Sequence, residues 1–563
     1  MRFRALLVVT LLVGCSASAN DVPVKPSPVP HDGGSPAQPT PVAGGGSGSG
    51  SSSPTPVDGG APSGSDAGSN AGSDAGSDAG SGTTMDPPAA AGEIGPTAAE
   101  CAAPSAPATT LCEATNGAHC YYLDPTAGND ASGDGSYAKP WRSFANVVTY
   151  YGTPGELGST ARPSTAVDVK AGDYVYLRSG TYDGSYNYAG SIVSLFYRNV
   201  DASASAIHIK AYPGQTPVIA PSVKAVAITV LQSKGFVIED IEIKGAYQFG
   251  VWVDESDAVT LRRLHVHDTD GVDNDNIAGI HFLQATHAEL ACSTVHDNYD
   301  RTNADTNGVA TENSSNVVAF GGGSLRIHHS LFYQTPATSA AKSGGCIKYK
   351  HAAVDVDAVF EVDHDILRQC KFMGVGTGTQ HSRIHHNVFQ GGGGIVSRDF
   401  GGPTHQTDQV FRFNSFYHAF YESGTLDISP TSNWNNASFT DPKGFVFSDN
   451  VVVEARTAAS QESGTIAIGT YASDALYQAT VPELKLERNC YMNESGPLHF
   501  ALFAANGGNY GALGAEYDFP GWQALGFDVD SVESAPGFIA ASEGNLELAA
   551  TSPCAKMGAY AKP

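Results

Sequence analysis

The sequence predicts an all-β protein built as a parallel β-helix, on the basis of three observations. A short strand pattern, apolar-x-x-small or polar-x-apolar, recurs nine times between residues 238 and 486. Its closest recurrences are 22 and 23 residues apart, and no segment shows the hydrophobic period of a long helix. A propeller would need a period of about 40–45 residues, and the leucine signature of leucine-rich repeats is absent. The pattern therefore predicts stacked coils of short strands.

Two columns of strands follow from this repeat. The first column places one apolar residue of each coil in a core stack: Ile238, Leu261, Leu290, Ile327, Val362, Ile384, Phe413 (in a motif one residue shorter), Phe447 and Leu486. A polar residue three positions later is expected to hydrogen-bond across coils: Ser293, Ser330, Asp365, Asn387, Asn450 and Asn489. The second column comprises 251–254, 280–283, 309–312, 347–350, 375–378 and 395–398. The second and fourth residues of each of these strands should point outward.

The first hundred residues predict export and tethering. A positively charged start precedes an apolar stretch of about ten residues, the size of a signal-peptide core. It ends at Leu12-Val13-Gly14-Cys15, which resembles the bacterial lipobox. We expect residues 1–15 to be a lipoprotein signal with Cys15 lipidated; cleavage after Ala17 or Ala19 is the alternative. Residues 16–100, rich in Gly, Ser, Pro and Asp, should form a disordered linker before a folded domain at 101–563.

Composition limits the partners. The formal net charge of −26 disfavours nonspecific nucleic-acid binding, and no apolar run is long enough to span a membrane. The lipobox-like tetrad predicts a protein of the bacterial cell envelope, anchored by lipid to the outer membrane or cell surface, or released from it, and we expect it to be a monomer. Eight cysteines besides Cys15 predict disulfides in an exported protein. One local bridge is expected among Cys101, Cys112 and Cys120.

Both ends of the folded part resemble a known family. The segments 121–125, 128–130, 140–144 and 171–182 resemble the opening of secreted pectin-lyase-like β-helix proteins, and 536–538, 546–548 and 552–554 resemble their closing coil. The resemblance implies a right-handed β-helix, as does the crossover rule. It also implies a short N-terminal capping helix, for which Trp141, Phe144, Val147 and Tyr151 have suitable spacing. The fold hosts lyases, hydrolases, epimerases and binding proteins, so it does not fix the activity.

The outward residues of the second column indicate chemistry on an acidic sugar. Lys350 and Arg398 should lie about 10 Å apart, with Gly378 on the coil between them and Glu312 one coil from Lys350. Elimination from a uronic acid requires a cation beside the carboxylate and a base for the neighbouring proton. The layout resembles lyases for alginate and for dermatan or chondroitin. That resemblance implies Lys350 or Lys348 as base, Arg398 as an assisting cation and Glu312 as a calcium ligand.

Further residues complete the candidate site. Trp252 and His281 point outward and are candidate substrate-binding residues, and Asp254 is another candidate calcium ligand. The loop 268–276 is rich in oxygen ligands, with Asp273 and Asp275 as candidates; a plain polar loop is the alternative. Three motifs predict either a histidine ladder at a turn or a transition-metal site: His328-His329, Asp363-His364 and His385-His386.

Taken together, the residues and the resemblance predict a protein that acts on an acidic polysaccharide by β-elimination, with calcium as the candidate cofactor. Competing enzyme signatures are missing, namely the paired aspartate motifs of pectin-hydrolysing enzymes and the Arg-x-Pro-x-x-Arg of the main pectate lyases. The alternative is a noncatalytic glycan-binding or structural surface lipoprotein. In that case Lys350 and Arg398 would belong to a solvated column of charges.

Overall fold

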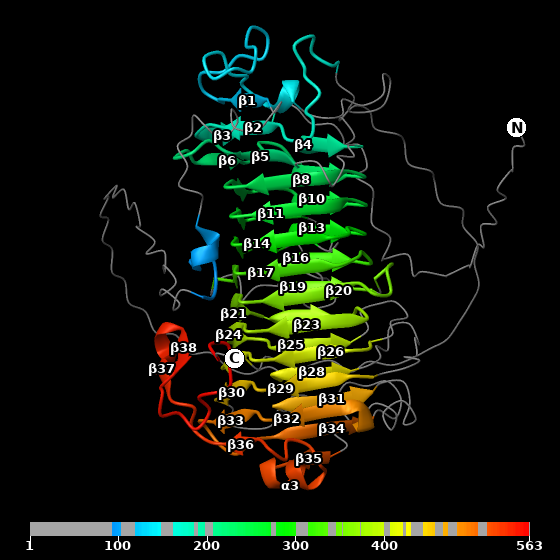
Figure 1. The fold of residues 1–563 in the computed structure, drawn as a ribbon, viewed down its shortest axis with the longest axis vertical. Coiled ribbons are helices and arrows are strands. Elements are labelled where there is room, and N and C mark those ends of the chain that lie inside the picture. Colours follow the sequence, from blue (N-terminus) through cyan, green and yellow to red (C-terminus); the bar gives the residue numbers. More distant parts are fainter. Residues whose placement is uncertain are drawn as a thin grey trace, which may run out of the picture. The chain divides into compact units, whose positions relative to one another are not determined.

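The computed structural model describes most of the chain from residue 93 onward (Figure 1). The described residues are 93–102, 119–147, 161–184, 190–197, 206–271, 277–299, 314–335, 345–351, 353–371, 373–398, 406–419, 424–429, 443–455, 465–470, 481–504 and 515–561. They belong to one compact unit. The predicted signal peptide with Cys15, and nearly all of the predicted linker, lie outside them. Among the described helices, none is long and apolar enough to cross a membrane.

Three sheets of twelve strands each form this unit. Sheet A comprises β1 (Cys120–Leu123), β2 (Tyr174–Leu177), β5 (Ile207–Ala211), β8 (Lys234–Glu239), β11 (Asp257–Arg262), β14 (Ala288–Ala291), β17 (Leu325–His328), β20 (Val359–Asp363), β23 (His381–His385), β26 (Gln409–Arg412), β29 (Phe445–Ser448) and β32 (Leu484–Glu487). Sheet B comprises β3 (Gly180–Tyr182), β6 (Pro217–Ile219), β9 (Glu242–Lys244), β12 (His265–His267), β15 (Thr294–His296), β18 (Leu331–Tyr333), β21 (Ile366–Cys370), β24 (Val388–Gly392), β27 (Ser415–Tyr417), β30 (Val451–Glu454), β33 (Cys490–Asn493) and β36 (Val532–Glu533). Sheet C comprises β4 (Ser191–Phe196), β7 (Val226–Leu231), β10 (Phe249–Asp254), β13 (Ala278–Leu283), β16 (Ser315–Phe320), β19 (Gly345–Lys350), β22 (Val375–Thr377), β25 (Ile395–Arg398), β28 (Leu426–Ser429), β31 (Ile466–Thr470), β34 (Phe500–Ala504) and β35 (Ala515–Tyr517).

The chain visits sheets A, B and C in turn and then begins the next coil, so that β8, β9 and β10 are followed by β11, β12 and β13 (Figure 1). Neighbouring strands are parallel throughout the stack, until β35 closes sheet C as an antiparallel strand. This is the predicted parallel β-helix. Between residues 234 and 487, sheet A contains β8, β11, β14, β17, β20, β23, β26, β29 and β32, which confirms the stacked coils that the nine recurrences predict.

The core stack confirms the predicted register with one correction. Ile327, Val362 and Ile384 pair in order and are fully buried. The next partner in the column is Phe411, not the predicted Phe413. The repeat at this coil is therefore not shortened. Phe413 has a positive φ and stands at the corner between sheets A and B.

That corner repeats the same backbone geometry on nine successive coils. Its residues have left-handed φ angles: Asp240, Arg263, Cys292, His329, His364, His386, Phe413, Asp449 and Arg488. The residue after each corner position points inward, and from Ser293 onward it is polar and fully buried. Asn414 extends the predicted polar ladder: its Oδ1 accepts from Asn387 N at 3.1 Å, and its own N donates to Asn450 Oδ1 at 2.9 Å. The ladder is therefore longer than predicted.

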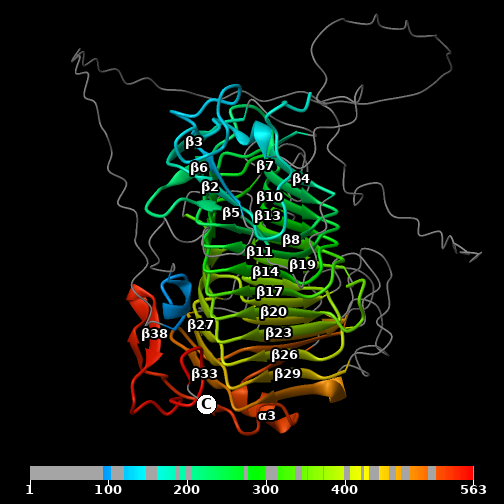
Figure 2. The same cartoon turned by 45° about the horizontal axis from the view of Figure 1, so that its top comes forward.

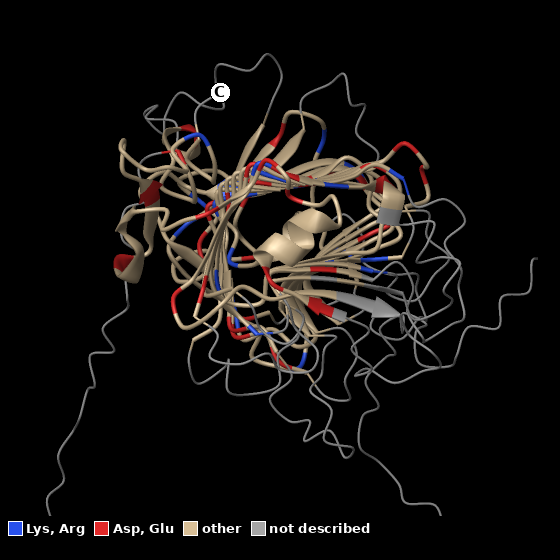
Figure 3. Ribbon diagram, turned by 90° about the horizontal axis from the view of Figure 1, so that it is seen from below, with Lys and Arg blue, Asp and Glu red and all other residues tan. Residues whose placement is uncertain are grey.

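The two ends of the stack are closed differently. At the top, the predicted capping helix is, within the described residues, one 3₁₀ turn, η2 (Phe144–Asn146), whose Phe144 and the nearby Trp141 are buried in the core. At the bottom, α3 (Phe519–Ala524) lies over the opening between the sheets (Figure 3). Trp522 of α3 is fully buried and stacks on Phe500 at 5.0 Å.

The C-terminal segment is not the closing coil that the family resemblance implied. Its strands β37 (Phe538–Ala540) and β38 (Asn545–Leu548) form a separate antiparallel pair, followed by a segment that reaches back along the outside of sheet B. Leu546 packs there against Leu331, Ile366 and Val388, together with Ile94 from the N-terminal side. Figure 2 shows β38 and the segment 93–102 next to each other on this flank. Within the described residues, the other short helices are η1 (Ala99–Cys101), η3 (Val481–Glu483) and η4 (Ala541–Glu543).

Disulfides join segments that are distant in sequence. Cys101 bonds to Cys292, with a separation of 191 residues, so it does not take part in the expected local bridge. The other described pairs are Cys346–Cys370 and Cys490–Cys554. Cys120 is disulfide-bonded as well, and Cys112 lies outside the described residues. Because residues 93–101 are attached by this bond and by buried Ile94 and Ala98, the described fold begins before the expected boundary at residue 101.

Candidate functional site

The outward face of sheet C carries the predicted lysines and arginine. Lys348 and Lys350 alternate with core residues Ile347 and Tyr349 on β19, which places both amines on the outward face. The register pairs Tyr349 with Thr377 and Thr377 with Ser397. Arg398 therefore lies two coils from Lys350, with Gly378 on the coil between, as predicted. Strand spacing puts these two backbone positions about 10 Å apart.

The second column contains one register error. The strand between Ile280 and Ile347 is 317–320, because Ile280 pairs with Val317 and Val317 with Ile347. The predicted strand 309–312 lies outside the described residues. Phe320, not Glu312, is therefore the neighbour of Lys350 in this row. The predicted strand partner of β19 is therefore corrected from 309–312 to 317–320, and the role of Glu312 as a calcium ligand stays a prediction.

Both lysines are buried, although they point away from the core. The exposed fraction is 2% for Lys348 and 5% for Lys350, and Lys350 Nζ lies 5.0 Å from the ring centroid of Phe320. A ring face attracts a cation, and more strongly so when water is excluded. Arg398 is partly exposed. The alternative of a solvated column of charges is thus wrong for the two lysines.

An aromatic cluster continues this face from Lys350 toward earlier coils. Trp252 and His281 are register partners and are buried, with 6% and 3% of their surface exposed. His281 stacks on Phe249 at 4.4 Å and lies 5.4 Å from Phe320. Burial, with a smaller contribution from the charge of Lys350, lowers the pKa of His281 to about 3. The imidazole is therefore neutral at pH 7 and is a weak base.

Two polar atoms in this cluster lack a hydrogen bond. Trp252 Nε1 and His281 Nδ1 are both buried without a partner in the described part of the chain. A buried polar group without a partner costs about 1–3 kcal/mol, so such atoms are uncommon unless they meet a ligand or water. They lie on neighbouring strands of one face. The pair therefore supports the prediction that Trp252 and His281 bind a ligand.

Carboxylates on this face lie far from the lysines. Asp254 stands three coils from Lys350 in the same row, and Asp427 stands three coils from Lys348 on the other side. Both are buried. Three strand spacings correspond to about 14 Å. No two described carboxylates occupy adjacent strands of this face, and Asp273, Asp275 and Glu312 lie outside the described residues. Calcium binding stays a prediction.

The sequence missed three residues of the site. Phe320 belongs to the strand 317–320, which the predicted register does not include. Phe249 precedes the predicted strand 251–254 by two residues. Asp427 lies on β28, which extends the column beyond the predicted 395–398. An alternating pair, Leu426 and Ile428 around Asp427, was the signal that could have identified this strand.

The three histidine motifs form the predicted ladder at the corner between sheets A and B. The rings of His329, His364 and His386 stack at centroid distances of 4.8 and 5.0 Å, and Phe413 continues the stack at 5.1 Å. These side chains belong to the corner, and the lysines belong to sheet C. This histidine stack is therefore separate from the candidate site on sheet C.

Comparisons with known proteins return the fold only. No protein-family model matches the sequence, and no curated protein matches it. The fold is similar to that of a pectate lyase, Pel9A, with 14% identity, a TM-score of 0.36 and coverage of 58% of this chain and 81% of that one. An alginate lyase from Paenibacillus sp. str. FPU-7 is 12% identical, with a TM-score of 0.32 and coverage of 60% of this chain and 91% of that one. A GH136 lacto-N-biosidase from Eubacterium ramulus is 10% identical, with a TM-score of 0.33 and coverage of 69% of this chain and 65% of that one.

Proposed function

We propose that the outward face of sheet C binds an acidic polysaccharide and cleaves it by β-elimination. The observation that carries the proposal is the pair of buried amines, Lys348 and Lys350, which share one strand and one face. Amines buried on the outward face of a sheet are uncommon, and a buried ionisable group is a candidate for catalysis.

The residues have distinct roles in this reaction. The neutral amine of Lys350, or of Lys348, takes the proton from C5 of the uronic acid. Arg398 neutralises the adjacent carboxylate as negative charge develops on it. The electron pair of the C5–H bond forms the C4–C5 double bond, the bond from C4 to the glycosidic oxygen breaks, and the departing oxygen takes a proton from water. Burial beside another cation is the environment that favours the neutral form of an amine. His281, with its lowered pKa, is the poorer base and is assigned to binding.

On the sheet C face, the coil between the lysines and Arg398 has glycine at both outward positions. Gly376 pairs with Lys348 on one side and with Val396 on the other, and Gly378 stands between Lys350 and Arg398. Gly376 and Gly378 are buried, and no side chain of this strand stands between Lys350 and Arg398 on the sheet C face. Calcium is proposed as the cofactor, with Asp254, three coils from Lys350, and Glu312, which lies outside the described residues, as candidate ligands.

A panel of uronic-acid polysaccharides tests the proposal. Elimination creates a conjugated double bond, so we expect ultraviolet absorbance to rise with at least one polymer, while neutral polysaccharides give none. Binding to a polymer without absorbance change would contradict the lyase and favour a noncatalytic glycan-binding protein. Repeating the assay after chelation checks the proposed calcium, with activity restored by added Ca²⁺ as the expected result.

The location at the cell envelope is proposed on the sequence alone. The tetrad that ends at Cys15 would be cleaved and its cysteine lipidated, with residues 16–100 as tether. Cys15→Ser should move the protein from the membrane fraction to the soluble fraction of the cell envelope or to the medium. Unchanged membrane association would contradict the anchor.

A further inference from the structure

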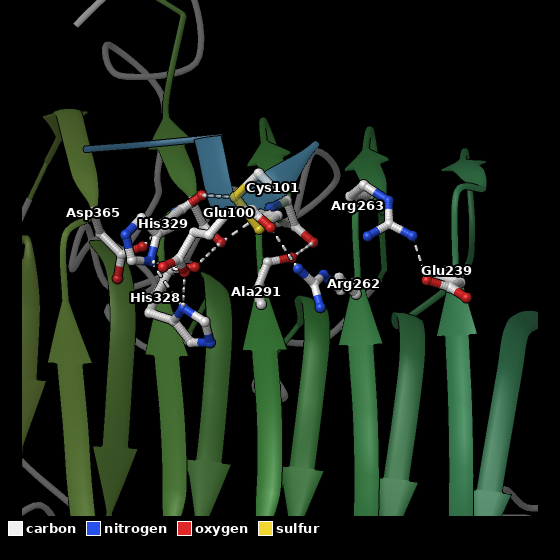
Figure 4. The surroundings of a disulfide bond; sticks show 12 residues. Glu100, Cys101, Glu239, Arg262, Arg263, Ala291, His328, His329 and Asp365 are labelled. Atoms are coloured by element: carbon white, nitrogen blue, oxygen red, sulfur yellow. Dashed lines mark hydrogen bonds and ion pairs between the residues drawn. A yellow bond between two sulfur atoms is a disulfide. The ribbon is translucent and has the colours of Figure 1, made fainter. Parts of the chain in front are cut away.

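The N-terminal segment 93–102 lies against the corner between sheets A and B, on the side away from the lysines. It is attached by the Cys101–Cys292 disulfide, by a hydrogen bond from Gly95 N to His364 O at 2.8 Å and by one from Arg262 Nη2 to Glu100 O at 2.7 Å. Figure 4 shows that these contacts bring the Glu100 side chain over His328 and His329. The carboxylate comes from a segment that is separate from the coils.

Three ligand atoms converge at this place. Glu100 Oε1 lies 2.7 Å from His329 Nδ1 and 3.4 Å from His328 Nδ1, and the two Nδ1 atoms are 2.9 Å apart (Figure 4). Zinc binds imidazole nitrogen and carboxylate oxygen at about 2.0–2.2 Å, so tetrahedral ligands of one ion stand about 3.3 Å from each other. The three atoms need only small shifts to reach that arrangement.

The two imidazoles are fixed in orientation. His328 Nε2 lies 2.9 Å from Glu289 Oε1, and Thr260 Oγ1 donates to the other oxygen of Glu289. A carboxylate on the far nitrogen of a histidine is a common partner of a metal-binding imidazole, because it fixes the tautomer that leaves the near nitrogen free. His329 is held by its stacking on His364. Both histidine side chains are 7% exposed, whereas Glu100 is 52% exposed.

Two similar clusters on the same corner lack this combination. Asp363 belongs to both, with His329 and His364 in one and with Glu361 and His385 in the other. Asp363 already binds the Arg326 guanidinium, at 2.9 and 2.8 Å, so a positive charge occupies the place of a metal ion. His385 and His386 also bring their Nδ1 atoms within 3.0 Å, but no described cluster adds a carboxylate to that pair of atoms.

We propose that Glu100 Oε1, His328 Nδ1 and His329 Nδ1 bind one divalent transition-metal ion, zinc being the best fit. Nitrogen and carboxylate donors on a tetrahedral framework suit zinc, and the exposed side of Glu100 leaves the fourth position for water. Binding displaces any proton held between the two Nδ1 atoms. The ion would clasp the segment 93–102 to the coils beside the disulfide.

Calorimetric titration of the full chain with zinc chloride, disulfides intact, tests the site. We expect one zinc ion per chain. His329→Ala, His328→Ala and Glu100→Gln should each weaken binding by about tenfold or more, and Glu289→Gln by about 10–100-fold. His386→Ala is the matched control, since this residue occupies the same corner position and the same ring stack. It should leave the affinity unchanged.

Two further readouts keep the proposal testable if a histidine variant folds poorly. Glu100→Gln removes the negative charge of an exposed side chain and replaces one carboxylate oxygen by an amide nitrogen. Co²⁺ bound to the unchanged protein should give the absorption bands of a four-coordinate site, and these bands should weaken or disappear in the variant. After reduction of Cys101–Cys292, zinc should slow proteolysis within residues 93–102. Absence of zinc binding, or equal losses for His386→Ala and His329→Ala, would show that the three side chains are merely hydrogen-bonded.

Discussion

The corner between sheets A and B and the outward face of sheet C belong to the same coils but differ in how their residues repeat. At the corner, nine left-handed residues follow one another, and a buried polar side chain comes after each from Ser293 onward. On the sheet C face, one row changes at every coil: His281, Val318, Lys348, Gly376, Val396 and Asp427.

This difference separates stability from function. A ladder side chain accepts a hydrogen bond from the backbone N–H of the equivalent residue on the preceding coil, so the stacking of coils itself selects a polar residue there. Nothing in the stacking of coils requires an amine at Lys348 or Lys350, which must each be desolvated. Residues that break the repeat are therefore the candidates for function, and residues that keep it are the candidates for stability.

The largest expected effect is the loss of turnover on removing the proposed base. Lys350→Met keeps the volume of this buried side chain and removes the amine, so we expect a decrease in kcat of about 10²–10⁴-fold with a small change in Tm. Lys350→Arg should not restore activity, because a guanidinium stays protonated. Lys485→Met, at an exposed lysine of β32, is the control.

Lys348→Met discriminates between the two amines. If Lys348→Met lowers kcat as much as expected for loss of the base, and Lys350→Met keeps the kcat of the unchanged protein, the base is Lys348. Full activity in both variants would remove the amine mechanism altogether.

A loss of folding stability is expected from the ladder instead. Asn450 Oδ1 accepts from Asn414 N, and its Nδ2 donates to Phe411 O at 3.1 Å and to Asn489 Oδ1 at 3.1 Å. Asn450→Ala removes these hydrogen bonds, and each buried group left without a partner costs about 1–3 kcal/mol. Some of these groups keep a second hydrogen bond, so we expect the free energy of unfolding to fall by about 2–5 kcal/mol in total. Urea unfolding measures it. A loss below that of an exposed Asn→Ala variant would contradict the ladder's role.

The repeat explains how much of the fold was predictable. Ile327, Val362 and Ile384 stack as predicted because an alternating strand fixes the inward face. The error at Phe413 arose because Phe411-Arg412-Phe413 offers two aromatic residues in one motif, and only the following Asn414, as a ladder residue, selects Phe411.

The site was less predictable, for two physical reasons. Long insertions between strands leave several alternating segments to choose from, so 309–312 was preferred to 317–320. Burial of Lys348 and Lys350, and the partners of Glu100, depend on segments that are remote in sequence. The Cys101–Cys292 bond spans 191 residues, and no local pattern indicates it.

A smaller, pH-dependent effect is expected at Asp365, the one carboxylate in the ladder between Ser293 and Asn489. Its Oδ1 accepts from Ser330 N at 2.6 Å, while Oδ2 has no partner in the described structure. In the next coil, the equivalent Asn387 Nδ2 donates to the carbonyl of Val362. Burial, with the nearby Asp363 charge, raises the pKa of Asp365 well above its usual value, so the folded state favours the protonated acid more than the unfolded state does.

The sign of this effect follows from linkage. An unfolded aspartate loses its proton near pH 4, and above that pH the folded state alone still binds it, so Asp365 lowers stability as pH rises. Asp365→Asn does not titrate and can donate like Asn387. We expect a gain of about 1–3 kcal/mol at neutral pH that becomes smaller toward pH 4.

Asp363→Asn gives the opposite control two residues away. Burial disfavours the charge of Asp363, but hydrogen bonds from His364 and Arg326 outweigh it and lower the pKa of Asp363. That variant should therefore lose stability at neutral pH, and the loss should diminish in acid. A pH-independent gain for Asp365→Asn would mean that Asp365 is ionised in the folded state.

The smallest effect is expected where the corner column carries charge without burial. Arg488 and Asp449 occupy the same left-handed position on adjacent coils, and the guanidinium donates to both carboxylate oxygens at 2.9 and 3.0 Å. Arg488 is 46% exposed, so water and salt screen the pair, and exposed pairs contribute about 0.2–1 kcal/mol. Arg488→Gln should lower the free energy of unfolding by less than about 1 kcal/mol, and the difference should shrink at high ionic strength. Urea unfolding at low and high salt measures both. A larger, salt-independent loss would mean that the corner column itself contributes stability through its side chains, and that the buried ladder beside it is not the main support of the repeat.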